Sequence, residues 1–118
     1  MGSDRYAFHA DLLAESEMPR RGIHSQTISD QHDIELVLFA MASGEQLSEH
    51  TSARPAIVHV LSGEGHLTVD GDRHDVKPGS WMRMEARTPH ALVAATALVF
   101  ALYLLPQGFR DGEPVERS

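Results

Sequence analysis

The sequence predicts an all-β protein that folds as one sandwich or barrel of short strands. After Gly22 the apolar residues either alternate with polar ones or form short apolar runs of about five to nine residues. Clusters of Gly, Asp, Pro and Ser bound these runs, so turns recur about every eight to twelve residues. A chain of 118 residues can bury one sizeable core, which indicates a single domain.

The first predicted element is a short helix near the N-terminus. Residues 9–17, HADLLAESE, carry apolar side chains at helical spacing, and the stretch from Pro19 to Gly22 ends this pattern. We therefore assign residues 1–22 to an N-terminal helix and lead-in. The β-barrel is expected over residues 23–106, followed by a polar C-terminal tail over residues 107–118.

Eight or nine strands are expected after this helix. The clearest strand-like runs lie within residues 23–29, 34–42, 56–62, 66–70 and 90–106. The run 34–42 is apolar at nearly every position, which is typical of a strand covered on both faces. Residues 90–106 divide into two strands that meet near Ala95 and Thr96.

Two tight turns separate strands in the second half of the chain. Asp70 and Gly71 lie between two strand-like runs and predict a type I′ hairpin, because both central residues of that turn have positive φ. Pro78 and Gly79 predict a further turn. These turns fix where the neighbouring strands begin and end.

Composition excludes several classes of site and partner. There is no cysteine, so a disulfide, a thiolate metal site and a cysteine nucleophile are excluded, and any metal needs His or carboxylate ligands. The net charge of -7 argues against a nucleic-acid partner, because phosphate binding needs clustered Lys and Arg. No signal-peptide pattern is seen, and the longest uncharged stretch, residues 91–105, is shorter than the ~20 residues that span a bilayer. We expect a soluble, cytoplasmic protein that binds neither nucleic acid nor membrane.

Two stretches of the chain resemble the paired signatures of the cupin superfamily. In the first, Gly44 leads, His50 takes the first histidine position and Gly63 closes the motif at the expected distance. In the second, Gly79 and His90 are in register. The resemblance covers about residues 34–105 and implies a small single-domain, RmlC-like cupin, which is a jelly-roll β-barrel.

The resemblance implies only half of a metal shell. Metal-binding cupins hold one divalent ion with two histidines and a glutamate of the first signature and one histidine of the second. Here Ser52 and Ala56 replace the second histidine and the glutamate. In the second signature the replaced positions are Glu85, Arg87 and Ala94. His50 and His90 are thus the metal candidates, for Zn, Fe, Mn or Ni, and two imidazoles alone bind weakly because such sites normally take three protein ligands.

A third ligand would have to come from outside the signature positions. The candidates are His24, His59, His66, Glu49 and Glu85. Strand alternation puts Ala56 and His59 on opposite faces, so a pocket that contains position 56 does not contain His59. We interpret His59 as a hydrogen-bonded residue of an inter-sheet or subunit contact, and His66 and His74 as solvated residues beside acidic neighbours.

Loss of two polar ligands makes the predicted interior more apolar. The expected ligand-binding pocket consists of His50, Ser52, Met82, Met84 and His90. Methionine suits an adaptable apolar cavity because its thioether chain is flexible, although a pair of methionines on a strand is also common in a plain core. Phe39, Met41, Phe100 and Tyr103 are expected in the core or in a dimer contact.

Two function classes follow from these residues. In the first, the protein binds a small organic ligand in an apolar barrel cavity, without a complete metal site. In the second, it is a metal-dependent cupin enzyme of the dioxygenase or isomerase type, using His50, His90 and a third ligand; without metal, either histidine could also shuttle a proton. A purely structural or interaction module is a third hypothesis. The resemblance also implies a homodimer, which fits a strand covered on both faces.

Overall fold

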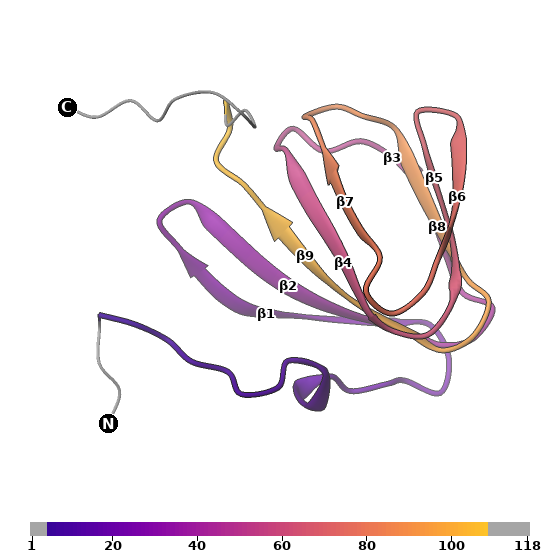
Figure 1. Cartoon of the computed structure of the whole chain (residues 1–118), viewed down its shortest axis with the longest axis horizontal. Coiled ribbons are helices and arrows are strands. Elements are labelled where there is room, and N and C mark those ends of the chain that lie inside the picture. Colours follow the sequence, from indigo (N-terminus) through magenta and orange to yellow (C-terminus); the bar gives the residue numbers. More distant parts are fainter. Residues whose placement is uncertain (1–4, 109–118) are drawn as a thin grey trace.

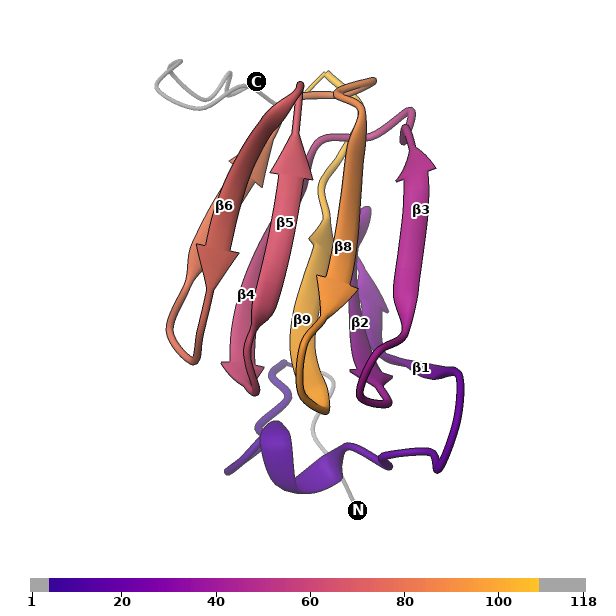
Figure 2. The ribbon, with the colours of Figure 1, turned by 90° about the vertical axis from the view of Figure 1, so that its right-hand side faces the viewer.

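The computed structural model describes residues 5–108, and their regular secondary structure is almost entirely β-strand (Figure 1). The described strands are β1 Ile23–Gln31, β2 Ile34–Met41, β3 Gln46–His50, β4 Ala56–Ser62, β5 Gly65–Val69, β6 Asp72–Val76, β7 Trp81–Met84, β8 His90–Ala94 and β9 Leu98–Leu104. They form a five-stranded sheet in the order β1-β2-β9-β4-β7 and a four-stranded sheet in the order β3-β8-β5-β6. Figure 2 shows the four-stranded sheet lying in front of the other. The predicted all-β, two-sheet barrel is confirmed.

The N-terminal helix is shorter than predicted. It is one 3₁₀ turn, η1, over Leu13–Glu15, and none of its residues is buried. The Ala14 N–H donates to Asp11 Oδ1 (3.3 Å), but so short a segment with no buried face cannot repay the cost of helix nucleation. A hydrogen bond from Gln26 Nε2 to the Glu15 carbonyl (3.2 Å) ties the segment to β1 instead. Within residues 5–108, no helix is long and apolar enough to cross a membrane.

Two hairpins have positive φ at both turn residues. Asp70 and Gly71 have φ of 53° and 86° between β5 and β6, where Val69 pairs with Asp72, so the predicted hairpin is confirmed. His32 and Asp33 have φ of 58° and 62° between β1 and β2. The sequence analysis did not predict this second hairpin, because its turn contains no glycine.

The main core fills the space between the two sheets. Its buried members come from both sheets and are Met41, Ala56, Val58, Val60, Leu67, Val76, Met84, Leu92, Ala94, Leu98 and Phe100. Phe39 on β2 stacks on Phe100 on β9, with ring centroids 4.8 Å apart. The interior is therefore apolar along most of its length.

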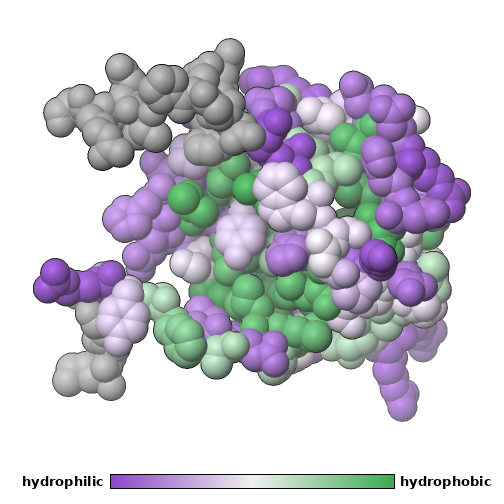
Figure 3. Space-filling view, viewed as in Figure 1, coloured by the Kyte–Doolittle hydropathy of each residue, from purple (hydrophilic) through white to green (hydrophobic). Residues whose placement is uncertain are grey.

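The outer face of the five-stranded sheet carries a second, smaller apolar cluster. Leu38, Ala40 and Val99 are buried there, and Ile28 and Leu61 pack against them. Strand β2 thus contributes to both clusters. It is covered on both faces from Leu36 onward, as predicted, whereas Ile34 at its start is exposed. Figure 3 shows apolar side chains gathered over the region where β2, β4 and β9 run together.

Candidate functional site

The two candidate histidines lie side by side at one end of the barrel. His50 ends β3 and His90 begins β8, at the upper end of the sheet in Figure 2. They are direct partners in the register of these strands, and their ring centroids are 4.2 Å apart with the planes tilted by 58°. The predicted juxtaposition of His50 and His90 is therefore present.

A β-bulge in β3 makes this pairing possible. Leu47 pairs with Leu92 and His50 pairs with His90, so β3 uses one more residue than β8 over this interval. Without the extra residue, Glu49 would oppose His90. Because a bulge changes the alternation of side chains, His50 lies on the same face as Leu47, which packs against the main core.

Backbone hydrogen bonds fix the tautomers of both rings. His50 Nδ1 lies 2.7 Å from the Ser48 carbonyl oxygen, and His90 Nδ1 lies 2.8 Å from the Thr88 carbonyl oxygen. A carbonyl oxygen can only accept, so each Nδ1 carries the proton and donates it. Each neutral ring consequently keeps its Nε2 lone pair for a ligand, a proton or a metal ion.

His90 is held in its neutral form more strongly than an ordinary histidine. Burial lowers the pKa of His90, the hydrogen bond to the Thr88 carbonyl opposes that effect, and the nearby His50 lowers the pKa further. His50 itself is exposed at the end of its strand. The pair therefore combines one shielded imidazole with one that faces solvent.

The residues around the pair do not complete a metal shell. Among residues 5–108, no group of three or more His, Asp or Glu side chains is arranged to hold a metal ion. Ser52 Oγ accepts a hydrogen bond from the Arg54 backbone N–H (3.1 Å), and Ala56 is buried opposite Met84. Two imidazoles therefore stand where a catalytic site normally has at least three protein ligands.

Four of the five side chains proposed as third ligands are used or placed elsewhere, and His66 is one of them, because it lies opposite Asp75 on the face of β5 that points away from Leu67. His24 Nε2 lies 3.2 Å from Gln26 Oε1 on the neighbouring part of β1, and Glu85 pairs with Arg83. His59 lies opposite Trp81 and Ala101, on the face of β4 that points away from Ala56, as the strand alternation predicted. A metal site with three protein ligands does not fit this arrangement.

A cavity of about 220 Å³ lies between the two sheets, on the side where β6 and β7 form their edges. Its lining residues are Val58, Val60, Leu67, His74, Asp75, Val76, Ser80, Trp81 and Met82. The lining is apolar inside and includes polar residues of the edge strand β6 and of the turn before β7. Neither His50 nor His90 lines this cavity, so the barrel offers two separate sets of functional groups.

The predicted pocket residues are divided between these two places. Met82 lines the cavity, whereas Met84 is buried in the main core. His50 and His90 form the pair at the end of the barrel, and Ser52 lies in the β3–β4 loop. The sequence prediction thus combined residues from the histidine end and from the cavity.

His74 was expected to be solvated, and it is exposed, but it also lines the cavity. A signal in the sequence could have placed it there. The Asp70–Gly71 hairpin sets Val69 opposite Asp72 and Leu67 opposite His74, so His74 shares the inner face with Leu67.

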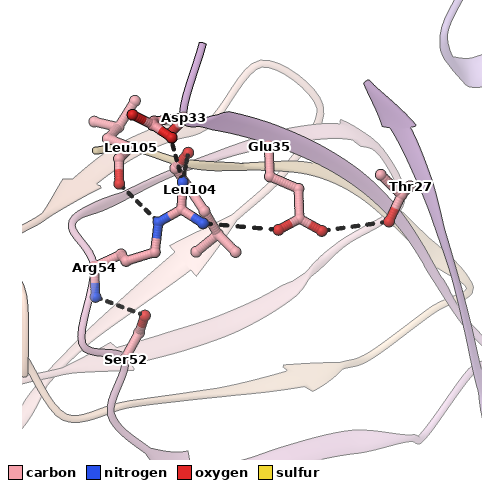
Figure 4. Close-up of polar contacts among 7 residues, drawn as sticks. All are labelled: Thr27, Asp33, Glu35, Ser52, Arg54, Leu104 and Leu105. Atoms are coloured by element: carbon pink, nitrogen blue, oxygen red, sulfur yellow. Dashed lines mark hydrogen bonds and ion pairs between the residues drawn. The ribbon is translucent and has the colours of Figure 1, made fainter. Parts of the chain in front are cut away.

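Arg54 fixes the loop that follows His50, and the sequence analysis did not single it out (Figure 4). Its Nε donates to the Leu105 carbonyl (2.9 Å), and its Nη2 donates to the carbonyls of Asp33 (2.6 Å) and Leu104 (3.1 Å). Glu35 lies 3.8 Å from Nη1. One guanidinium thus joins the β3–β4 loop, the β1–β2 hairpin and the end of β9.

Comparisons with known proteins agree with this architecture. A family profile described as Cupin domain matches residues 37–104. No match was found among curated proteins. A conserved protein of unknown function from Streptococcus pyogenes shares 29% identity, with a TM-score of 0.76 over 86% of this chain and 89% of that chain.

Two further solved structures share the fold. An RmlC-like cupin from Desulfovibrio desulfuricans is 20% identical, with a TM-score of 0.77 over 86% of this chain and 98% of that one. A salicylate 1,2-dioxygenase from Pseudoaminobacter salicylatoxidans is 13% identical, with a TM-score of 0.65 over 79% of this chain and 28% of that one. At these identities the likeness concerns the fold alone. Since the family profile covers more than half of the sequence, the chain belongs to the cupin family.

Proposed function

We propose that this cupin binds a small organic molecule in the cavity between its two sheets. The observation that carries the proposal is the cavity of about 220 Å³ with an apolar interior and polar groups at one edge. Binding sites for small molecules typically have this combination of apolar walls and a few polar groups. Drug-sized ligands need about 300 to 1,000 Å³, so this cavity suits a smaller molecule, about the size of one substituted ring.

Backbone contacts hold the cavity in shape. The Val60 N–H donates to the Ser80 carbonyl and the Gly79 N–H donates to the Val60 carbonyl, both at 2.8 Å. These bonds fasten the turn between β6 and β7 to β4, the strand that contributes Val58 and Val60. A preorganised wall of this kind lowers the entropy that a ligand must overcome on binding.

Methyl NMR of the full chain tests this proposal with benzyl alcohol as the probe. We expect the Met82 methyl signal to shift saturably, because Met82 lines the cavity, and the Met84 methyl signal to stay in place. Val58→Leu should weaken binding because it adds a methylene to the cavity wall. Val93→Leu, on β8 and outside the lining, is the matched control. Equal shifts of both methionine signals, or none, would contradict the proposal.

A metal-dependent enzyme is the alternative function. It is favoured by one observation, the neighbouring Nε2 lone pairs of His50 and His90. Elemental analysis of protein purified without an affinity tag, with His50→Ala beside it, separates the two functions. We expect the metal content to be low and unchanged by the substitution. One metal ion per chain that is lost in His50→Ala would favour the enzyme instead.

A further inference from the structure

We propose that the ligand of the cavity is an uncharged molecule with an apolar ring and a hydroxyl group, and that His74 is the residue that binds the hydroxyl. This inference rests on the proposed function, because it names the chemical class of the molecule in the same cavity. It follows from the inner face of β6, from the hydrogen bonds that the lining residues already make, and from the charges of the lining.

The strand register places His74 on the inner face of the four-stranded sheet. His74 pairs with Leu67, which is buried in the main core. Val76, two residues further along β6, is buried in the same core. Side chains two residues apart point to the same face of a strand, so the His74 imidazole lies beside these apolar side chains. Because β6 is an edge strand and His74 is exposed, the imidazole lies where the cavity meets solvent.

The His74 imidazole is available to a ligand. Backbone carbonyls hold the rings of His50 and His90, whereas the His74 ring makes no hydrogen bond to any residue within 5–108. A neutral imidazole has one donor nitrogen and one acceptor nitrogen, and nothing in this part of the chain fixes which is which. A hydroxyl group both donates and accepts, so it can bind the ring in either tautomer.

Ser80 is a second polar residue of the lining, and most of its groups are already bonded. Its N–H donates to the Lys77 carbonyl (2.9 Å), and its Oγ accepts from the Lys77 N–H (2.9 Å). Its carbonyl accepts from the Val60 N–H (2.8 Å). The hydroxyl proton is therefore the one group that Ser80 can offer, and His74 is the side chain on the inner face with both a donor and an acceptor.

The charges of the lining favour an uncharged ligand. Asp75 is its one carboxylate, and neither Lys nor Arg contributes to it. Asp75 pairs with His66, on the outer face of the four-stranded sheet. An ionic group inside the cavity would lose hydration without a charged side chain on the inner face to compensate for it.

The inner wall selects the apolar body of the ligand. It offers aliphatic carbon and one thioether sulfur, from Val58, Val60, Leu67, Val76 and Met82. An aromatic ring packs well here, because methionine sulfur makes favourable contacts with aromatic rings. A ring that fills this interior would leave its hydroxyl at the edge formed by β6, within reach of His74.

Two probes of the same shape test the inference. Benzyl alcohol and ethylbenzene differ in a hydroxyl group in place of a methyl group, and saturable shifts of the Met82 methyl signal give the affinity of each. In His74→Leu, the ratio of the benzyl alcohol affinity to the ethylbenzene affinity should fall about two- to tenfold, as expected for the loss of one neutral hydrogen bond. His74→Gln keeps a donor and an acceptor, so this ratio should stay within about twofold of its value in the unaltered protein.

His66→Leu is the matched control, because His66 lies on the neighbouring strand β5 but on the outer face, outside the lining. It should leave both affinities unchanged. The inferred ligand class is wrong, while cavity binding stands, if His74→Leu leaves the ratio unchanged or His66→Leu lowers it equally. Tighter binding of benzoate or benzylamine than of benzyl alcohol would overturn it as well. If no probe shifts the Met82 signal, the proposed function itself fails.

Discussion

At the scale of single residues, the histidine pair depends on one extra residue in β3 and on two backbone carbonyls. The sequence predicted that His50 and His90 would be neighbours, because both occupy signature positions. It did not predict the tautomers, because these depend on the carbonyls of Ser48 and Thr88. Such contacts are set by the local backbone path and leave no pattern in the sequence.

The lowered pKa of His90 gives the pair a defined pH response in protein freed of metal with a chelator. Because the pKa is below that of the unfolded chain, the unfolded state binds more protons in the region around and below pH ~6.5. The contribution of His90 to the free energy of unfolding should therefore fall as the pH decreases through this window.

NMR titration of the His90 ring should show that His50→Ala raises the pKa of His90, because a repelling neighbour is removed. An unchanged or lower pKa in that variant would contradict this account.

Gly63 shows how one missing side chain allows two turns to meet. A Cβ atom at Gly63 would lie 2.0 Å from the Ala97 carbonyl oxygen and 2.7 Å from the Leu98 Cα atom. Gly44 has a similar φ, +85° against +87°, with no atom within 4 Å of such a Cβ. We expect Gly44→Ala to lower the free energy of unfolding by about 1 kcal/mol, and Gly63→Ala to lower it by about 2 kcal/mol more.

Urea unfolding of both glycine variants measures this difference. Both variants carry the same cost of a side chain at positive φ. The difference between their losses of unfolding free energy therefore measures the cost of separating the two turns at Gly63. Equal losses of stability would show that the backbone at Ala97 moves away at little cost.

At the scale of elements, Arg54 ties together three segments that are distant in the sequence. Arg54→Ala should lower the free energy of unfolding by about 2 to 3 kcal/mol, because the carbonyls of Asp33, Leu104 and Leu105 lose their donor. Arg54→Lys should recover only part of this loss, since an ammonium cannot reproduce the planar fork. Chemical denaturation provides the measurement.

Arg73→Ala is the control for Arg54→Ala, because Arg73 makes an exposed ion pair at 3.6 Å. This variant should change stability by less than about 0.5 kcal/mol. Similar losses in the two variants would mean that the guanidinium of Arg54 is no more important than an ordinary surface charge.

At the scale of the whole molecule, features encoded locally were predicted correctly. Alternation of apolar residues and the Asp70–Gly71 turn gave the strands and the hairpin, because both depend on a few neighbouring positions. The N-terminal helix was predicted too long, since helical spacing without a packed face does not stabilise a helix. Homodimer formation stays a prediction, which light scattering of the purified protein can test.

The cavity was not predicted as it stands, because it depends on how the edges of two sheets meet. Val58 and Met82 are register partners in one sheet, as are Leu67 and His74 in the other. Each pair follows from local alternation, but the distance between the pairs depends on how the sheets pack. The sequence therefore indicated an apolar interior without showing which residues leave space.

The extra residue in β3 also bears on how barrels of this kind diverge. Deleting Ser48 would leave His50 opposite His90 on a regular strand, since the deletion removes the surplus position. Alternatively, with Ser48 kept, the loop after β3 could absorb the surplus residue. The strand would then slip by one position, and the Glu49 carboxylate would face His90. A change in loop length could thus exchange an imidazole for a carboxylate without any substitution in the strand itself.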